Sequence, residues 1–268
     1  GLGDVYKRQL KMLSPRKPYR EWAQRNRVRL EEIANLRTEQ PAINSETLLS
    51  RQAAMGWTSE EITMVVKTMY EDATEPVGSM GDDTPVAVLS SRPKPLYNYF
   101  KQLFAQVTNP PIDPLRESVV MSLRVHMGKH GSFLVEHPAL ARVLRVDHPV
   151  VLDEEMAALR NTPGFSCVTL STVWPAAAGP EGLRAALDRL CAEADHAARN
   201  GARLLVLSDR AADREFAPVP MLLAVGAVRR HLMDSGLRMR LGIVAETGDA
   251  WDIHHFATLI GYGCEVVY

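Results

Sequence analysis

Cysteine is scarce in this chain of 268 residues, which has three cysteines, Cys167, Cys191 and Cys264. They lie far apart and form no Cys-x-x-Cys pair, so we do not expect a zinc or iron–sulfur site built from this chain alone. Free cysteine is among the most buried residue types, and we interpret all three as small core side chains. Unpaired thiols are typical of a reducing compartment, which favours the cytoplasm.

Charge of one sign is not in excess either. The 31 Lys and Arg residues balance 32 Asp and Glu residues to a net charge of -1, which excludes the strongly basic character of a nucleic-acid-binding protein. No apolar run approaches the roughly 20 residues of a membrane helix, and no secretory leader is visible. We therefore expect neither nucleic acid nor membrane as a partner. Hydrophobic residues make up 46% of the chain, enough for the core of one or two domains.

The two ends of the chain suggest a fragment. It starts at Gly1 rather than Met, and it stops at 265–268, an apolar run that reads as a strand without a cap or tail. A short last strand at a genuine C-terminus is the alternative. We favour a fragment that is incomplete at the C-terminus, because a domain does not normally end inside a hydrophobic element.

The first part of the chain, 16–75, is charged and reads as helical. Its clearest element starts at Thr58, which with Glu61 forms a capping box. Apolar residues follow at helical spacing, which predicts a helix over about 59–71.

Turn residues and prolines break up the next part, 76–116. We expect a short strand at 86–89, an amphipathic helix at 96–107 and another helix at 115–127 that ends at Gly128. Between the two helices, 108–114 contains three prolines, each of which fixes φ and removes a backbone donor. This stretch is expected to be a rigid loop.

Strands and helices alternate from about 165 to the end of the chain. The expected strands are 168–170, 203–209, 241–245 and 264–267, and the helices between them are 181–199, 218–234 and 251–260. Apolar strands separated by helices predict a parallel sheet with buried strands. The fold class is therefore α/β, with a helical and loop-rich N-terminal part followed by repeated βα units.

The default site candidates are the polar residues that follow the predicted strands, because parallel sheets carry their sites at the carboxyl ends of the strands. These are Ser208 and Asp209 after one strand, and Glu246 and Thr247 after the next. The competing interpretation is loop solvation and helix capping.

Two other polar segments carry weaker signals. The neighbours His254 and His255 would point about 100° apart on a helix, so we interpret them as surface or core histidines rather than metal ligands. In the proline-rich loop, Thr108 and Asn109 offer uncharged polar groups that could line a cavity or passage, and a buried connector is the alternative.

Several segments together resemble the central region of the large chain of glutamate synthases. The longest, 97–117, reads YNYFKQLFAQVTNPPIDPLRE, and the others are 75–85, 88–90, 179–183, 205–210, 254–257 and 261–263. The resemblance runs from about residue 16 to the end. It implies three parts: a non-family or linker segment at 1–15, a helical connector from the amidotransferase domain at 16–75, and the truncated central domain at 76–268. Within the first part, 1–9 would be a cloning or sequencing scar or a divergent linker.

The family's reaction joins ammonia from glutamine to 2-oxoglutarate and reduces the product to glutamate. The resemblance implies that this region helps to wall an internal ammonia passage, with Thr108 and Asn109 as candidate lining residues. It also implies FMN and an iron–sulfur cluster for the full-length enzyme, both held in the later barrel. The expected partners are the amidotransferase and FMN-barrel domains of the same chain, and a flavoprotein small subunit or ferredoxin.

The chain lacks the nucleophile that the glutamate synthase reaction needs. The family's nucleophile is an N-terminal cysteine, and no cysteine precedes Cys167. We therefore expect no complete active site, and no catalytic, cofactor-binding or metal-binding residue is assigned. The electron donor stays open between NADPH, NADH and ferredoxin. Two other functions also remain open: a stand-alone small-molecule-binding domain that uses Asp209 and Glu246, or an assembly module for separate glutaminase and flavin chains.

Overall fold

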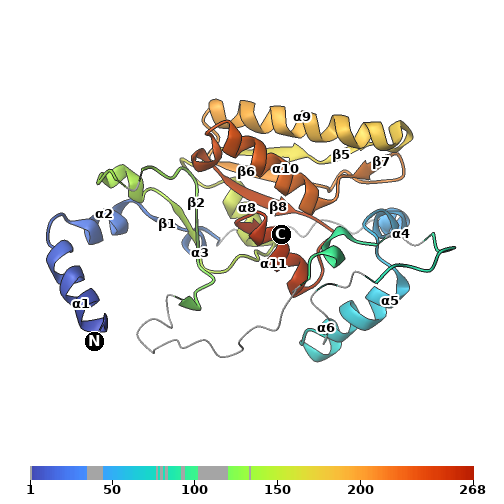
Figure 1. The fold of residues 1–268 in the computed structure, drawn as a ribbon, viewed down its shortest axis with the longest axis horizontal. Coiled ribbons are helices and arrows are strands. Elements are labelled where there is room, and N and C mark those ends of the chain that lie inside the picture. The colour runs from blue at the N-terminus through green and yellow to red at the C-terminus, as the bar shows by residue number, and fades with distance from the viewer. Residues whose placement is uncertain are drawn as a thin grey trace.

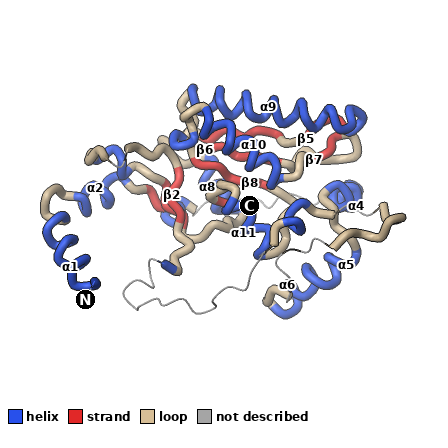
Figure 2. The backbone as a smooth tube through the Cα atoms, viewed as in Figure 1, coloured by secondary structure: helices blue, strands red, loops and turns tan. Residues whose placement is uncertain are grey.

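The computed structural model describes residues 2–34, 45–76, 78, 81, 84–91, 94–101, 120–132 and 134–268. Figure 1 shows an α/β arrangement in which long helices lie against a central sheet, and Figure 2 marks the same elements by type. None of the helices in the described ranges is long and apolar enough to cross a membrane.

The central sheet is parallel, as predicted. Its strands are β4 (Cys167–Ser171), β6 (Leu204–Ser208), β8 (Gly242–Glu246) and β9 (Val266–Val267), paired in the order β4-β6-β8-β9. Every residue of β6 and β8 is buried, which explains their continuous apolar sequences. The four strand predictions in this part of the chain are therefore confirmed, with bounds that differ by one or two residues.

Alternate residues of these strands face two separate hydrophobic cores. Leu205 and Leu207 point into a core shared with α9 (Gly179–Arg199), α10 (Met221–Asp234) and α11 (Ile253–Gly261). Leu204 and Val206 point the other way, into a core shared with α8 (Asp153–Arg160). Each fully buried side chain of this kind contributes about 1.5–3 kcal/mol, so the two cores fix the sheet between its helical layers.

Helix α9 shows why this region reads clearly from sequence. Its buried residues recur at helical spacing: Ala186, Leu190, Ala194, Ala197 and Ala198. The helix has a proline in its first turn and ends before Gly201, whose φ of +87° is easy only for glycine. The predicted helix at 181–199 is confirmed.

Two smaller sheets flank the central one. In the first, β1 (Val28–Arg29) pairs in parallel with β3 (Leu144–Val146), and β2 (Val125–Met127) pairs antiparallel with β3. Met127 and Leu144 belong to the core on the α8 side, so this sheet closes that face. The second is the antiparallel pair β5 (Val173–Pro175) and β7 (Phe216–Pro218).

Short helices make up much of the N-terminal part. They are α1 (Leu2–Leu13), α2 (Tyr19–Asn26), α3 (Leu30–Ile33), α4 (Ser45–Ala54), α5 (Ser59–Glu61), η1 (Ile62–Val66) and α6 (Lys67–Asp72). The last three join into one helix with a π-helical middle, and Thr58 and Glu61 form the predicted capping box. Single 3₁₀ turns occur later in the chain, at η2 (Leu96–Tyr99), η3 (Pro138–Ala141), η4 (Ala176–Ala178) and η5 (Arg238–Arg240).

Four expectations about elements need correction. The amphipathic helix expected over 96–107 is only the 3₁₀ turn η2 at its start, because the backbone becomes extended at Phe100, and 102–107 lie outside the described residues. Residues 86–89 form no strand but a loop and turn, in which Val88 is 99% exposed. The helix expected over 115–127 does not reach its predicted end, because 125–127 is strand β2. The helix expected from Pro218 starts at Met221, because Pro218 ends strand β7 and the segment first pairs with β5.

The cysteine interpretation is confirmed for Cys264 and holds in part for Cys167, which packs against the core on the α8 side, but it is wrong for Cys191. Cys264 is buried, and burial raises the pKa of its thiol to about 12. Cys167 and Cys191 are only half-buried. Cys167 begins edge strand β4 and Cys191 lies on α9, the outer helical layer, so neither position is fully covered.

Candidate functional site

The carboxyl edge of the central sheet gathers the polar residues that follow β6 and β8. Asp209 is 3% exposed, and its carboxyl group accepts hydrogen bonds from the Thr247 hydroxyl and from the backbone N–H of Gly248 at 3.1 Å. Burial raises the pKa of Asp209 to about 7, against the opposing effect of the Thr247 hydrogen bond. The sheet therefore brings two of the predicted candidates, Asp209 and Thr247, into direct contact.

A second buried carboxyl group extends this cluster. The Thr247 hydroxyl also lies 2.9 Å from Asp249, and burial raises the pKa of Asp249 as well. A hydroxyl has one proton to donate, so contact with two carboxyl groups is satisfied only when one of these carries a proton itself. The raised pKa of Asp209 is consistent with a proton shared along the Asp209–Thr247–Asp249 chain.

Asp249 ties two distant segments to this edge. It accepts a hydrogen bond from the Tyr97 hydroxyl at 2.7 Å and from the backbone N–H of Met221 at 2.9 Å. Tyr97 comes from the 3₁₀ turn η2 and is 2% exposed, and Met221 begins α10. Because both carboxylate oxygens are occupied, Asp249 anchors η2 and the start of α10 to the sheet edge.

Aromatic rings cover the same cluster. The Tyr97 ring stacks on His255 at a centroid distance of 4.3 Å, and Trp251 contacts His255 edge-on. Trp57 packs against Trp251 at 4.5 Å and donates its indole N–H to the Gly248 carbonyl at 2.8 Å. The helical N-terminal part is thereby attached to the loop after β8.

The neighbouring residues His254 and His255 have different hydrogen-bond partners. His255 is 2% exposed, and burial lowers its pKa to about 4, so the ring is neutral at pH 7 and accepts the Trp251 backbone N–H. The Nε2 atom of His254 lies 2.9 Å from the Tyr97 carbonyl oxygen instead. Over the described residues, no three or more His, Cys, Asp or Glu side chains are grouped so that they could hold a metal ion.

Glu246 lies on the other face of the sheet, toward α8. It is 2% exposed and forms ion pairs with Arg160, at 2.7 Å, and with Arg210. Arg210 also donates to the Tyr268 hydroxyl at 2.7 Å, and its guanidinium covers the Tyr268 ring. Tyr268 in turn donates to Asp153 on α8 at 2.8 Å.

The candidates Asp209 and Glu246 therefore lie at the same edge of the sheet, but they do not form one site. Asp209 and Glu246 point to opposite faces of the sheet, and each is buried with its own partners. Sequence reasoning found these two residues from their position after apolar strands. Asp249 follows the same strand as Glu246 but was not chosen as a candidate. Tyr97 and Trp57 were missed, and no local pattern points to them, because Tyr97 is 152 positions away from its partner Asp249 and Trp57 is 191 positions away from Gly248.

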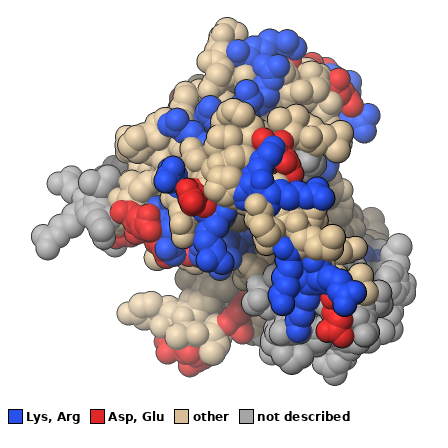
Figure 3. All heavy atoms as spheres, turned by 90° about the vertical axis from the view of Figure 1, so that its left-hand side faces the viewer, with Lys and Arg blue, Asp and Glu red and all other residues tan. Residues whose placement is uncertain are grey.

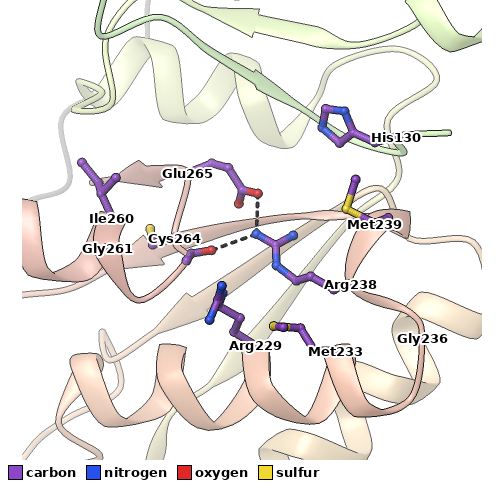
Figure 4. A pocket seen from close by; sticks show the side chains of 11 residues that line it. His130, Arg229, Met233, Gly236, Arg238, Met239, Ile260, Gly261, Cys264 and Glu265 are labelled. Carbon is purple, nitrogen blue, oxygen red and sulfur yellow. Dashed lines mark hydrogen bonds and ion pairs between the residues drawn. The ribbon is translucent and has the colours of Figure 1, made fainter. Parts of the chain in front are cut away.

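The opposite edge of the sheet has an open cavity of about 870 Å³ (Figure 4). Arg238 lies in it and donates to the Glu265 carboxylate and to the Gly263 carbonyl at 2.9 Å. Arg229 of α10 packs over Gly263, where φ is +107° and an added Cβ would lie 2.0 Å from the arginine side chain. Only glycine fits this position.

Comparison with known protein families gives a clear match. The family model described as "Glutamate synthase central domain" matches residues 50–268. The chain belongs to the glutamate synthase central domain family. Its relatives include ferredoxin-dependent glutamate synthase 2 of Arabidopsis thaliana, chloroplastic, 45% identical over 93% of this chain. The NADPH glutamate synthase large chain of Azospirillum brasilense is 40% identical over 99%, and the NADH glutamate synthase of Schizosaccharomyces pombe is 41% identical over 85%.

These relatives are much longer than this chain, which spans 15%, 18% and 11% of their respective lengths. The resemblance seen in the sequence is confirmed.

The iron–sulfur cluster that the glutamate synthase resemblance implies does not fit the cysteines of this chain. Cys167 begins β4, Cys191 lies in α9, and Cys264 is buried with its thiol directed to the Val266 carbonyl. A cluster needs thiolates that converge on one point. The candidate passage residues Thr108 and Asn109 lie outside the described residues.

Proposed function

We propose that this chain is the central scaffold of a glutamate synthase, the enzyme that converts glutamine, 2-oxoglutarate and a reductant to glutamate. The family match and the relatives support a part of such an enzyme. In this proposal 1–15 is a non-family or linker segment, 16–75 connects to the amidotransferase domain, and 76–268 is the central domain. The chain is inactive alone, and it works in the reducing compartment where the whole enzyme is found.

The closed carboxyl edge of the sheet is the observation that carries the scaffold role. This is the edge where parallel sheets usually bind ligands. Here Asp209 is held by Thr247 and Gly248, and Glu246 is held by Arg160 and Arg210. We propose that these carboxyl groups position the loops around them and that the reacting groups belong to other domains.

The stand-alone small-molecule domain is the weaker alternative on the same geometry. A ligand at Asp209 or Glu246 would have to displace buried hydrogen bonds or ion pairs, and leaving a buried charge unpaired is costly. Tight binding of a small anion that depends on Asp209 or Glu246 would favour this alternative. Stable association with a separate glutaminase or flavin chain would favour the assembly module.

The second part of the proposal concerns ammonia transfer. We assign Thr108 and Asn109 to the wall of the passage between the amidotransferase and synthase sites. The chemical reason for a passage is that ammonia released into water is protonated and loses its nucleophilic lone pair. Uncharged polar side chains suit this role, because they can contact ammonia without donating a proton to it.

Cofactors and partners of the whole enzyme follow from the same proposal. FMN and an iron–sulfur cluster would be held by the barrel domain, where FMN passes reducing equivalents to the substrate. The electron donor is ferredoxin, or NADPH or NADH, directly or through a flavoprotein subunit. Relatives with each of the three donors in their names match this chain, at 40–45% identity.

The test uses the full-length enzyme that contains this chain. Thr108→Trp and Asn109→Trp should lower glutamine-dependent glutamate formation relative to glutamine hydrolysis, while ammonia-dependent synthesis is retained. Val88→Trp is the matched control, because Val88 is 99% exposed and a ring fits there without contacts. Unchanged coupling in both tryptophan variants would remove the passage role. Glutaminase or glutamate synthase activity of the isolated 268-residue chain would contradict the scaffold role.

A further inference from the structure

A basic pocket lies at the end of the molecule that carries α2 and the β1-β3-β2 sheet. Its volume is about 530 Å³. The lining residues are Arg20, Ala23, Gln24, Arg27, Arg29, Glu32 and Arg145. Figure 3 shows that basic side chains gather on this end of the molecule. The chain as a whole has a net charge of -1, so the positive charge here is local.

Two of the lining arginines already have acidic partners. Arg145 donates to Asp147 at 2.7 Å through Nε, and Arg29 forms ion pairs with Glu31, with Glu32 at 3.5 Å and with Asp147 at 4.0 Å. Arg124 shares Asp147 at 3.1 Å. The carboxylates near the pocket, Glu31, Glu32 and Asp147, are therefore already paired with these three arginines.

The guanidinium groups of Arg20 and Arg27 have no ion pair or side-chain hydrogen bond anywhere in the described part of the chain. They lie one on α2 and one just after it, on the same pocket wall. The Nε atom of Arg29 also has no hydrogen-bond partner among the described residues, but it is shielded from solvent, so the free donors that a ligand can reach are those of Arg20 and Arg27. The pocket thus holds unused donors of the type that bind oxyanions in a forked geometry.

The pKa of the neighbouring His126 is also affected by the positive charge of this region. The pKa of His126 on β2 is lowered, first by burial and then by Arg27, Arg145 and Arg124. The region therefore disfavours a further positive charge and favours an anion.

We propose that this pocket binds a small multivalent oxyanion of the phosphate or polycarboxylate class, with Arg20 and Arg27 as its principal ligands. The volume of the pocket lies within the range of small-molecule sites. The ligand should be negatively charged, because the guanidinium groups that are free to bind it are positively charged. The site is independent of the carboxyl edge of the central sheet and of the ammonia-passage proposal.

The experiment is a calorimetric titration of the 268-residue chain with sodium pyrophosphate and, separately, with sodium citrate. Sodium chloride at matched ionic strength controls for screening. Both anions bind the same donors in this proposal, and the tighter one identifies the ligand class. The variant is Arg20→Ala/Arg27→Ala, which should weaken binding about tenfold or more, since a charge-assisted hydrogen bond is lost with each side chain.

Arg25→Ala is the matched control. Arg25 lies on the same helix, carries the same charge and is paired with Glu21 outside the pocket. It should leave the affinity within about twofold of the unchanged chain, the usual effect of an exposed ion pair. Circular dichroism confirms the fold of each variant, and Arg20→Gln alone replaces the double variant if that variant unfolds.

Three results would overturn the proposal. The first is no binding of either anion beyond the sodium chloride control. The second is equal weakening by Arg25→Ala and by the double variant, which would mean unspecific screening. The third comes from the same titration carried out with poly-glutamate: its binding without binding of pyrophosphate or citrate would assign the surface to an acidic polypeptide instead.

Discussion

The buried carboxyl group of Asp209 should control how the stability of this protein depends on pH. Its pKa in the fold is about 7, above the ordinary value of 3.8. A group whose pKa is raised by folding contributes stability that is fully present below its unfolded pKa and is lost as pH rises through the folded pKa. The difference between 3.8 and about 7 corresponds to about 4 kcal/mol of unfolding free energy, lost between about pH 4 and pH 7.

His255 acts in the opposite direction over almost the same range. Its pKa in the fold is about 4, below the ordinary value of 6.5. Its contribution is fully present above about pH 6.5 and is lost as pH falls through about 4, which amounts to about 3 kcal/mol. In the unchanged protein the two effects largely cancel between pH 4 and 6.5.

Asp209→Asn should remove the contribution of Asp209 to the pH dependence of the unfolding free energy. An asparagine keeps an acceptor for the Gly248 N–H and offers a donor to Thr247, so the cluster can stay closed without a titrating group. The variant should then lose more stability than the unchanged protein on acidification from pH 6.5 to 4, by up to about 3 kcal/mol, because His255 is then opposed only by Asp249, whose pKa is also raised by burial.

The measurement is urea unfolding at half-unit steps from pH 4 to 8, followed by tryptophan fluorescence. Asp188→Asn, which removes the same charge at an exposed position of α9, controls for the change in net charge. Parallel pH curves for the unchanged protein and Asp209→Asn would refute the reasoning, because the carboxyl group would then titrate alike in the folded and unfolded states.

Two further predictions concern single contacts. Glu246→Gln should destabilise the fold by about 1–2 kcal/mol, because it removes the counter-charge of Arg160 and Arg210, whose side chains are 38% and 44% exposed and so remain partly solvated, and urea unfolding at pH 7 checks this. Tyr97→Phe should cost about 1–3 kcal/mol, because the buried Asp249 carboxylate loses its hydroxyl donor, whereas Tyr99→Phe at a 56% exposed ring should cost less than about 0.5 kcal/mol. Equal midpoints for the two tyrosine variants would exclude the anchoring role of Tyr97.

The α/β part could be predicted because its signals are local. Strands β6 and β8 are buried on both faces and are therefore apolar up to their last residues, Ser208 and Glu246, and the buried stripe of α9 recurs at helical spacing. Capping at Thr58 is local as well, because its partner Glu61 is three positions away.

The errors lie where the structure depends on distant partners. Among the described residues, the apolar run 86–89 pairs with no strand, and it stays an exposed loop. Residues 125–127 become a strand because β3, about 20 positions later, supplies the pairing. The candidate site follows the same rule. Asp209 and Glu246 could be predicted because they lie where apolar strands end. Their partners could not, because they come from other elements: Arg160, which pairs with Glu246, is 86 positions away.

The contact between Trp57 and Trp251 also has a spectroscopic consequence. One indole belongs to the segment before α5 and the other precedes α11, and their rings lie 4.5 Å apart at an interplanar angle of 43°. Two indoles held this close and tilted couple their electronic transitions and produce a paired signal in circular dichroism. The chain has four tryptophans, so this signal can be isolated by replacing Trp22 and Trp174. The protein thus contains an intrinsic optical reporter for the attachment of its N-terminal helices to the βα core.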